Sequence, residues 1–326
     1  MPTGEAKPST ILIADDEAVN RHLLDSILQK EGYVVISAHD GEEATNIFAS
    51  RYIDLALLDV KMPKRNGFEV CRSIKNNPRT RHVPVVLITG LINTNDRIAG
   101  IDSGADDYLH KPIRQEELKA RVRSLLRFKQ YSDELQSAEE ILFSLARSIG
   151  AKDPLAKGHC ERMSQYCAEL ADALGLPEEQ HDALKKAGIV HDIGEVAVPE
   201  NVLFKTGPLT PEEKVVFEQH PIVGERICAP LKSFRCVLPI IRHHHEKMDG
   251  SGYPDGLKGE AIPISARILA IVEVYDALTT DRNYRSALSS EEAFLAIQEE
   301  VQKGWWDGRV VEAFRKIIAA GTSPHP

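Results

Sequence analysis

Long apolar runs are missing from this sequence. The longest, at residues 53–60 and 83–89, have the length of strands and fall short of the roughly 18 apolar residues that a membrane-spanning helix needs. The first ten residues, MPTGEAKPST, also lack the apolar segment of a signal peptide. We therefore expect a cytoplasmic protein with no part embedded in a membrane.

Cysteine is scarce, and its spacing disfavours a cysteine-based framework. The five cysteines form no C-x-x-C pair and are odd in number. This pattern argues against a disulfide scaffold and against a thiolate metal site. We expect reduced, buried thiols, as is usual in the cytoplasm.

Positive charge is also in deficit. The chain has 40 basic and 49 acidic residues, a formal net charge of −9, which disfavours non-specific binding to DNA or to anionic membranes. The remaining composition, 42% apolar and 27% charged, is that of a globular protein and excludes a disordered chain. At about 150 residues per domain, 326 residues predict two domains.

The first domain is predicted at residues 10–127, after a disordered segment at 1–9. Short apolar runs alternate there with stretches long enough for crossover helices, which predicts a doubly wound α/β domain with a five-stranded parallel sheet. The expected strands are 11–14, 34–37, 55–59, 85–89 and 108–111.

A long helix is predicted at residues 115–150, joining the two domains. Apolar residues recur there at steps of three and four, as in a coiled coil, which suggests a homodimer formed through this helix. An ordinary capping helix followed by a separate helix is the alternative. The stripe consists of Leu118, Val122, Leu125, Phe128, Tyr131, Leu135, Ala138, Leu142, Leu145 and Ile149.

The second domain is predicted at residues 140–320 as an all-α bundle, followed by a short tail at 321–326. Helical periodicity dominates this half, and Gly and Pro are concentrated in the connections. The expected helices are 160–174, 178–191, 211–228, 237–245, 264–279, 291–303 and 307–319.

Polar residues follow the ends of the predicted parallel strands, and such ends lie at one edge of a sheet. Three carboxylates that meet there would repel one another without a cation, and Mg²⁺ prefers oxygen ligands. A lysine and a hydroxyl nearby would suit a phosphoryl group. The residues are Asp15, Asp16, Asp59, Thr89 and Lys111.

These residues, in the phrases ADDE, LLDVKMP, LITG and DDYLHKP, resemble the receiver domain of bacterial response regulators. The resemblance implies that Asp59 accepts a phosphoryl group from a cognate sensor histidine kinase and that Tyr108 is an aromatic switch. Asp15 and Asp16 would help to hold Mg²⁺, and Thr89 and Lys111 would contact the phosphoryl group.

Histidines and acids recur in the second half at places that suggest a metal centre. An adjacent His191-Asp192 pair ends an apolar helix, and Asp192 could bridge two ions. Glu273 lies on an apolar helix, where a buried carboxylate needs a partner. Imidazole and carboxylate ligands suit Fe, Mn, Zn, Ni or Co. The other candidates are His159, His220, His244 and His245, with His243 as a neighbour of the ligand pair.

The motifs HDIG at 191–194 and HHEKMDGSGYP at 244–254 resemble the HD-GYP family, a branch of the HD-domain metal phosphohydrolases. The resemblance implies an HD-domain bundle that hydrolyses cyclic di-GMP to pGpG and GMP. It implies that the metal ligands are His191, Asp192, His220, His244, His245 and Glu273, with His159 matching the family's early histidine. Residues expected to face the substrate are Gly252, Tyr253, Arg282 and Arg285.

Three positions depart from the family pattern. Glu273 stands where the family usually carries an aspartate, so it keeps the charge and adds a methylene. Leu155 stands where some members carry a glutamate that helps to hold a third metal, so we expect a two-metal centre. Glu195 stands where the family commonly has a lysine that faces a phosphate. Beside the substrate, Glu195 would weaken binding of the cyclic dinucleotide and favour linear pGpG; pointing to solvent, it would matter little. A catalytically weak module that binds nucleotide or protein is a third hypothesis.

Overall fold

The computed structural model describes residues 8–90, 103–150, 158–281 and 286–321. The segments predicted at the two ends of the chain fall largely outside these ranges, as do Leu155, Arg282 and Arg285. The chain divides into two compact units, 1–137 and 138–326, and each is described by itself.

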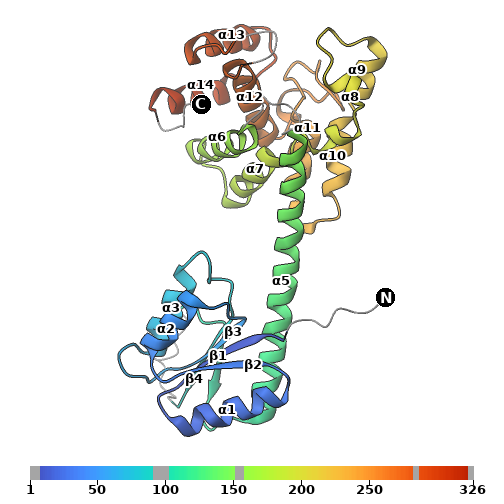
Figure 1. Cartoon of the computed structure of the whole chain (residues 1–326). Helices are drawn as coiled ribbons and strands as arrows, with labels where there is room; N and C mark the ends of the chain where they lie inside the picture. The colour runs from blue at the N-terminus through green and yellow to red at the C-terminus, as the bar shows by residue number, and fades with distance from the viewer. Residues whose placement is uncertain (1–7, 91–102, 151–157, 282–285, 322–326) are drawn as a thin grey trace, which may run out of the picture. The chain divides into compact units, whose positions relative to one another are not determined.

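The first unit contains the predicted parallel sheet, and the fold class is confirmed. The five strands are hydrogen-bonded in the order β2-β1-β3-β4-β5 (Figure 1). Their bounds are β1 (Thr10–Ala14), β2 (Val34–Ala38), β3 (Leu55–Asp59), β4 (Val85–Thr89) and β5 (Asp107–His110). All four pairings are parallel, so the carboxyl ends of the strands lie at one edge.

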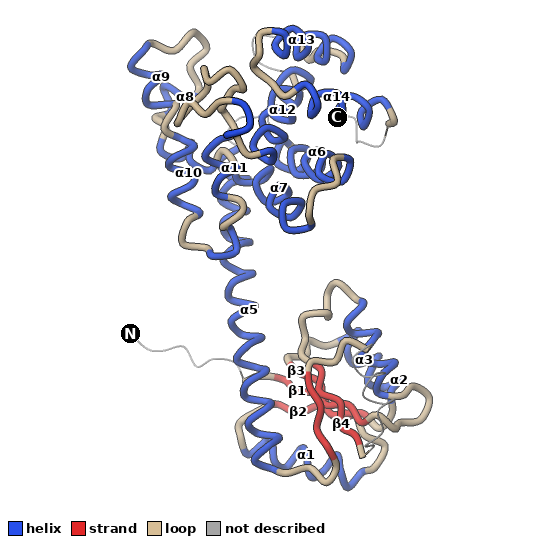
Figure 2. Tube along the Cα trace, turned by 180° about the vertical axis from the view of Figure 1, so that it is seen from behind, coloured by secondary structure: helices blue, strands red, loops and turns tan. Residues whose placement is uncertain are grey.

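Helices cover both faces of this sheet (Figure 2). Leu24 and Leu28 from α1 pack with Leu118 and Val122 from α5 on one face. The opposite face is covered by α2 and α3. The bounds are α1 (Ala18–Lys30), α2 (Gly41–Ser50), α3 (Gly67–Asn76) and α5 (Gln115–Gly150).

The helix α5 is one continuous helix of 36 residues, as the sequence predicts. Its buried side chains include Leu118 and Val122 in the first unit and Leu142 and Ala146 in the second. Lys129 ties it further to the first unit, since its buried ammonium donates to the Tyr52 hydroxyl at 2.9 Å.

The second unit is helical. Its α-helices are α6 (His159–Ala173), α7 (Glu178–Val190), α8 (Glu200–Leu203), α9 (Pro211–Phe217), α10 (His220–Cys228), α11 (Leu238–His243), α12 (Ile264–Thr279), α13 (Ser290–Gln302) and α14 (Gly308–Ala319). Short 3₁₀ helices are η1 (Ile193–Ala197), η2 (Lys232–Phe234) and η3 (Gly259–Ala261). Ten of the 16 residues of α12 are buried, which makes it the central helix of this bundle. Tyr166, Tyr275, Phe294 and Phe314 pack edge to face or tilted in its core.

The prediction of one helix over 211–228 is wrong, because α9 ends at Phe217 and α10 begins at His220. Pro221 has no backbone N–H to donate to the carbonyl of Phe217, four residues earlier. The ring Nδ1 of His220 takes that carbonyl instead, at 2.8 Å. The break therefore fixes the side chain of a predicted metal ligand.

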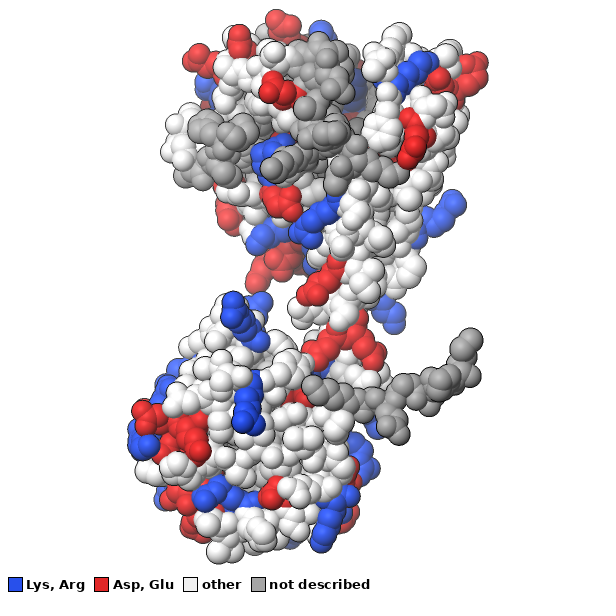
Figure 3. Space-filling view, in the orientation of Figure 1, with Lys and Arg blue, Asp and Glu red and all other residues white. Residues whose placement is uncertain are grey.

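Four of the five cysteines are buried and none forms a disulfide. Among the described residues, no helix combines the length and the apolar content that crossing a bilayer requires. On the face that Figure 3 shows, basic and acidic side chains are interspersed over both units.

Candidate metal centre and receiver pocket

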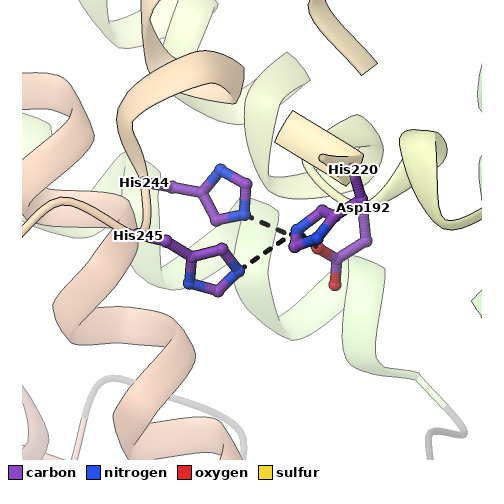
Figure 4. A group of neighbouring side chains, drawn as sticks. All are labelled: Asp192, His220, His244 and His245. Carbon is purple, nitrogen blue, oxygen red and sulfur yellow. Dashed lines mark hydrogen bonds and ion pairs between the residues drawn. The ribbon is translucent and has the colours of Figure 1, made fainter. Parts of the chain in front are cut away.

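Four predicted ligands meet in the second unit. Asp192 follows α7, His220 begins α10, and His244 and His245 lie in the turn after α11. Asp192 Oδ1 lies 3.5 Å from His220 Nε2 and 3.6 Å from His244 Nε2. The Nε2 atoms of His245 and His220 are 3.2 Å apart. Figure 4 shows the rings of His244 and His245 pointing toward His220 and Asp192.

A second group shares one residue with the first. One ligand atom each from His159, His191 and Asp192 lies within 4.8 Å of the others. The other Asp192 oxygen, Oδ2, is 3.0 Å from His191 Nε2. The two carboxylate oxygens of Asp192 therefore face different imidazoles, which is the arrangement expected of a residue that bridges two cations.

Hydrogen bonds on the far side of the rings decide which nitrogen faces the centre. Nδ1 of His220 lies 2.8 Å from the Phe217 carbonyl, and Nδ1 of His244 lies 2.6 Å from the Ile241 carbonyl. A carbonyl only accepts, so each Nδ1 carries the proton and each Nε2 presents a lone pair. This is how proteins commonly orient histidines that bind metals.

The protonation states of three ligands suit a cation, whereas Asp192, against the effect of burial, raises the pKa of a fourth, His191, to about 9, so that ring would release a proton on binding a metal. Burial lowers the pKa of His220 to about 4 and that of His245 well below its usual value, so both rings are neutral at pH 7. Burial opposes ionisation of Asp192, but the neighbouring histidines outweigh it and lower the pKa of its carboxyl well below the usual range. Neutral imidazoles around a carboxylate are the forms that ligate metals.

Some nitrogens of the centre have no hydrogen bond among the described residues. They are Nδ1 and Nε2 of His191 and Nε2 of His244, and all are buried. A buried polar atom without a partner is costly. Cations bound in the two groups, one by His244 and the other by His191, would satisfy one nitrogen of each ring, so the residues present fit a metal.

Gly194 of the HDIG motif lets η1 approach α10. A Cβ built there would lie 1.9 Å from the carbonyl oxygen of His220 and 2.6 Å from the backbone nitrogen of Gly224. No side chain fits at those distances. This contact brings Asp192 and His220 together, although 28 positions separate them (220 − 192 = 28).

Glu273 and Glu195 line the same cavity, of about 270 Å³, as His159, His191 and Asp192. Glu273 lies on α12, with its Oε1 3.9 Å from His245 Nε2, and burial raises its pKa. Glu195 lies on η1. The rest of the wall is largely apolar and includes Ile149, Ile189, Ile193, Leu203, Phe204 and Phe217.

The loop after His245 folds back on the histidines. The ring of Tyr253 packs against that of His245, with centroids 4.7 Å apart, and burial raises its pKa. A Cβ at Gly252 would lie 2.3 Å from the backbone nitrogen of Lys247. The space that Gly252 leaves open is thus taken by the chain's own backbone.

The strand ends of the first unit gather the predicted receiver residues. Ligand oxygens of Asp15, Asp16 and Asp59 lie within 4.8 Å of one another. The ammonium of Lys111 is 3.1 Å from Asp15 Oδ2 and 3.0 Å from Asp59 Oδ2. Burial raises the pKa of Asp59, although Lys111 opposes that shift.

Thr89 and Tyr108 lie on the neighbouring strands β4 and β5. Thr89 is buried at the end of β4. The hydroxyl of Tyr108 is buried and has no hydrogen-bond partner among the residues that the structure describes. Its burial raises the pKa of the phenol.

Comparison with known proteins agrees with both units. Residues 11–123 match the model of the response regulator receiver domain, and residues 144–310 match that of the HD domain. The chain is 36% identical over 94% of its length to a probable cyclic di-GMP phosphodiesterase of Vibrio cholerae, covering 77% of that protein. It belongs to the HD-domain response regulators.

Two further relatives also match nearly the whole chain. The cyclic di-GMP phosphodiesterase response regulator RpfG of Xanthomonas campestris is 36% identical over 93% of this chain and 86% of its own. A cyclic di-GMP phosphodiesterase of Thermotoga maritima is 32% identical over 94% of this chain and 90% of its own.

Sequence reasoning missed two carboxylates of this HD-domain response regulator. Glu246, 3% exposed, accepts the backbone N–H groups of Asp255 at 2.8 Å and Leu257 at 3.0 Å, so it shapes the loop that carries Tyr253. Oδ2 of Asp276 accepts a hydrogen bond from Nδ1 of His159 at 2.7 Å. Its position three residues after Glu273, on the same side of a helix, was the available signal.

The contact at Gly194 generates the first prediction. We expect Gly194→Ala to displace η1 from α10, because overpacking of this kind costs about 1–3 kcal/mol, and to lower both the unfolding temperature and the amount of metal bound. Differential scanning calorimetry and metal analysis would measure these effects. Gly207→Ala is the matched control, since a Cβ there meets nothing within 4 Å. Equal effects of the two substitutions would contradict the prediction.

Proposed function

We propose that this protein is a metal-dependent phosphodiesterase that hydrolyses cyclic di-GMP to pGpG, GMP or both. The observation that carries the proposal is the pair of ligand groups that share Asp192. The names of the three relatives that match most of the chain support the same substrate. In domain terms, we assign the phosphoryl-accepting role to 10–127 and hydrolysis to 140–320, with the helix at 115–150 between them.

The proposed cofactors are two divalent transition metals of the Fe, Mn, Ni or Zn class. His220, His244 and His245 would hold one, His159 and His191 the other, and Asp192 both, with Glu273 as a further ligand. Bound there, the ions would lower the pKa of a water molecule toward 7 and so supply hydroxide at neutral pH.

The remaining residues of the cavity would bind and orient the nucleotide. Leu203, Phe204 and Phe217 offer an apolar wall on which a guanine base can be buried. Tyr253 adds a ring and a hydroxyl beside His245. We assign Arg282 and Arg285, which lie outside the described residues, to the substrate phosphates.

The function test uses purified full-length protein supplied with Mn²⁺ or Fe²⁺. We expect conversion of cyclic di-GMP to pGpG or GMP, followed by chromatography, and a loss of at least about a thousandfold in Asp192→Asn, since one carboxylate serves both cations. Asp182→Asn is the control, because Asp182 is an exposed acid on α7. If the wild type binds metal and yet hydrolyses neither cyclic di-GMP nor pGpG, the protein is instead a catalytically weak binding module.

A second candidate substrate is linear pGpG, and Glu195 is the reason. This carboxylate lines the cavity that holds His191 and Asp192, where it would repel a phosphodiester. In the cyclic dinucleotide the ring fixes both phosphates, whereas the linear dinucleotide can keep its scissile phosphate at the cations and turn its terminal phosphate away from Glu195.

Glu195→Lys replaces this repulsion with an attraction. We expect the variant to lower the KM for cyclic di-GMP by up to about a hundredfold, the effect of a few kcal/mol. Glu195→Gln, which only removes the charge, should fall between the two. Side-by-side rates with cyclic di-GMP and pGpG would measure the preference, and unchanged values in both variants would mean that Glu195 does not face the substrate.

We also propose that phosphorylation of Asp59 by a cognate sensor histidine kinase controls the activity. The carboxylates of Asp15, Asp16 and Asp59 suit Mg²⁺, and Lys111 lies ready to neutralise a phosphoryl oxygen. Tyr108 has a buried hydroxyl that a rearrangement could satisfy, which suits a switch.

A homodimer through α5 is the last part of the proposal. Phe128, Tyr131 and Leu135 leave 72%, 62% and 43% of their surface exposed, at steps of three and four along the helix. Single exposed apolar residues are ordinary, but a stripe of them favours association.

Light scattering tests this association. We expect a mass of two chains for the wild type and of one chain for Leu135→Glu. Burying a charge between two helices costs more free energy than burying this apolar stripe contributes. Gln136→Glu, on the neighbouring exposed position, is the control. Measurements with and without beryllofluoride, and in Asp59→Ala, would show whether phosphorylation changes the mass or the hydrolysis rate. A wild-type mass of one chain in every state would refute the dimer.

A further inference from the structure

Asp276 is a deeply buried carboxylate beside the metal centre. It lies on α12 and only 2% of it is exposed. Its Oδ2 is 2.7 Å from Nδ1 of His159, and its two oxygens accept from Arg162, at 2.5 Å for Nε and 3.1 Å for Nη2. His159 and Arg162 are one turn apart on α6, so a single carboxylate joins two side chains of one helix face.

This contact fixes the direction of the His159 ring. An ionised carboxylate only accepts hydrogen bonds, so Nδ1 of His159 carries the proton. The lone pair is then on Nε2, the nitrogen on the far side of the ring from Asp276. The ring also lies beside that of His191, with centroids 5.4 Å apart.

The two ligand groups differ in how their histidines are held. In the group of His220 and His244, backbone carbonyls accept the Nδ1 protons. In the other group, His159 is held by a side chain. A substitution can therefore remove the support of one cation position and leave that of the other intact.

Arg162 balances the charge of Asp276 and holds its carboxylate in place. Its guanidinium contacts both oxygens of Asp276, which balances the charge of a carboxylate that has almost no access to water. The guanidinium also fixes the rotation of the carboxylate, and hence the position of the oxygen that meets His159.

We propose that Asp276 is a positioning residue that turns His159 toward the cation shared with His191 and Asp192, and that Arg162 holds Asp276 in place. The inference rests on the two-cation centre proposed above. It adds that the two positions are supported independently and that Asp276 governs only one of them.

Metal titration tests this without substrate. We expect calorimetry with Mn²⁺ to give two binding events for the wild-type chain. In Asp276→Ala, binding of the cation held by His159 and His191 should weaken by about 10–100-fold, as is typical when the partner of a ligating histidine is removed. The affinity for the other cation should stay unchanged. The visible spectrum of bound Co²⁺ should change in the same variant, because one imidazole leaves the coordination sphere.

The matched control is Asp307→Ala. Asp307 is 5% exposed and forms a buried ion pair with Arg267 at 3.0 Å, in the same unit, but neither residue belongs to the ligand groups. We expect it to lower the unfolding temperature and to keep both metal affinities. If Asp276→Ala does not fold, Asp276→Asn, which has the same shape, provides the comparison, with a smaller weakening of the same event.

The outcomes separate this inference from the proposed function. The inference is overturned if the Asp276 variants bind both cations with wild-type affinity, or if both binding events weaken equally. It is also overturned if Asp307→Ala loses as much metal affinity as Asp276→Ala, or if the wild type binds only one cation. A wild type that binds two cations but hydrolyses no cyclic di-GMP would reject the proposed function and leave the role of Asp276 standing.

Discussion

The second unit is organised around one electrostatic constraint, the packing of the half-buried Asp192 against buried imidazoles. Its two oxygens face His220 and His244 on one side and His191 on the other. Several buried histidines around a half-buried carboxylate are costly to maintain unless hydrogen bonds and a cation satisfy their polar atoms. The surrounding structure meets that requirement with backbone carbonyls behind the rings and with close backbone contact at Gly194.

The receiver pocket also brings carboxylates close together, but there a lysine of the protein offsets part of their charge. The sheet register brings Asp59 and Thr89 to the edge where Asp15 lies, and the ammonium of Lys111 offsets part of their charge. A long helix, α5, contributes side chains to the cores of both units. Its far end, at Ile149 and Gly150, forms part of the wall of the cavity beside the metal centre, so the catalytic unit includes the last turns of a helix that begins in the receiver.

Much of the fold could be read from local signals. The strands at 55–59 and 85–89 and the helix at 264–279 have the bounds that the sequence predicts, because each combines strong apolar periodicity with clear ends. The expected helix at 211–228 failed where the signal was subtle: Pro221 is tolerated early in a helix, and the capping box at Thr210 marks only the start. The helix α9 ends because Pro221 has no N–H to donate to the carbonyl of Phe217, and the ring of His220 binds that carbonyl instead.

The sequence by itself determined the order of the two units, the parallel sheet, the continuity of α5 and the residue types of both sites. These follow from periodicity and from motifs whose members are close together in the chain. The tertiary structure decided which nitrogen of each ring faces the centre, that Asp192 joins two groups, and that Asp276 holds His159 across 117 positions of sequence. Such contacts depend on how helices pack, and no local pattern of residues records the distance between two side chains that only the finished core brings together.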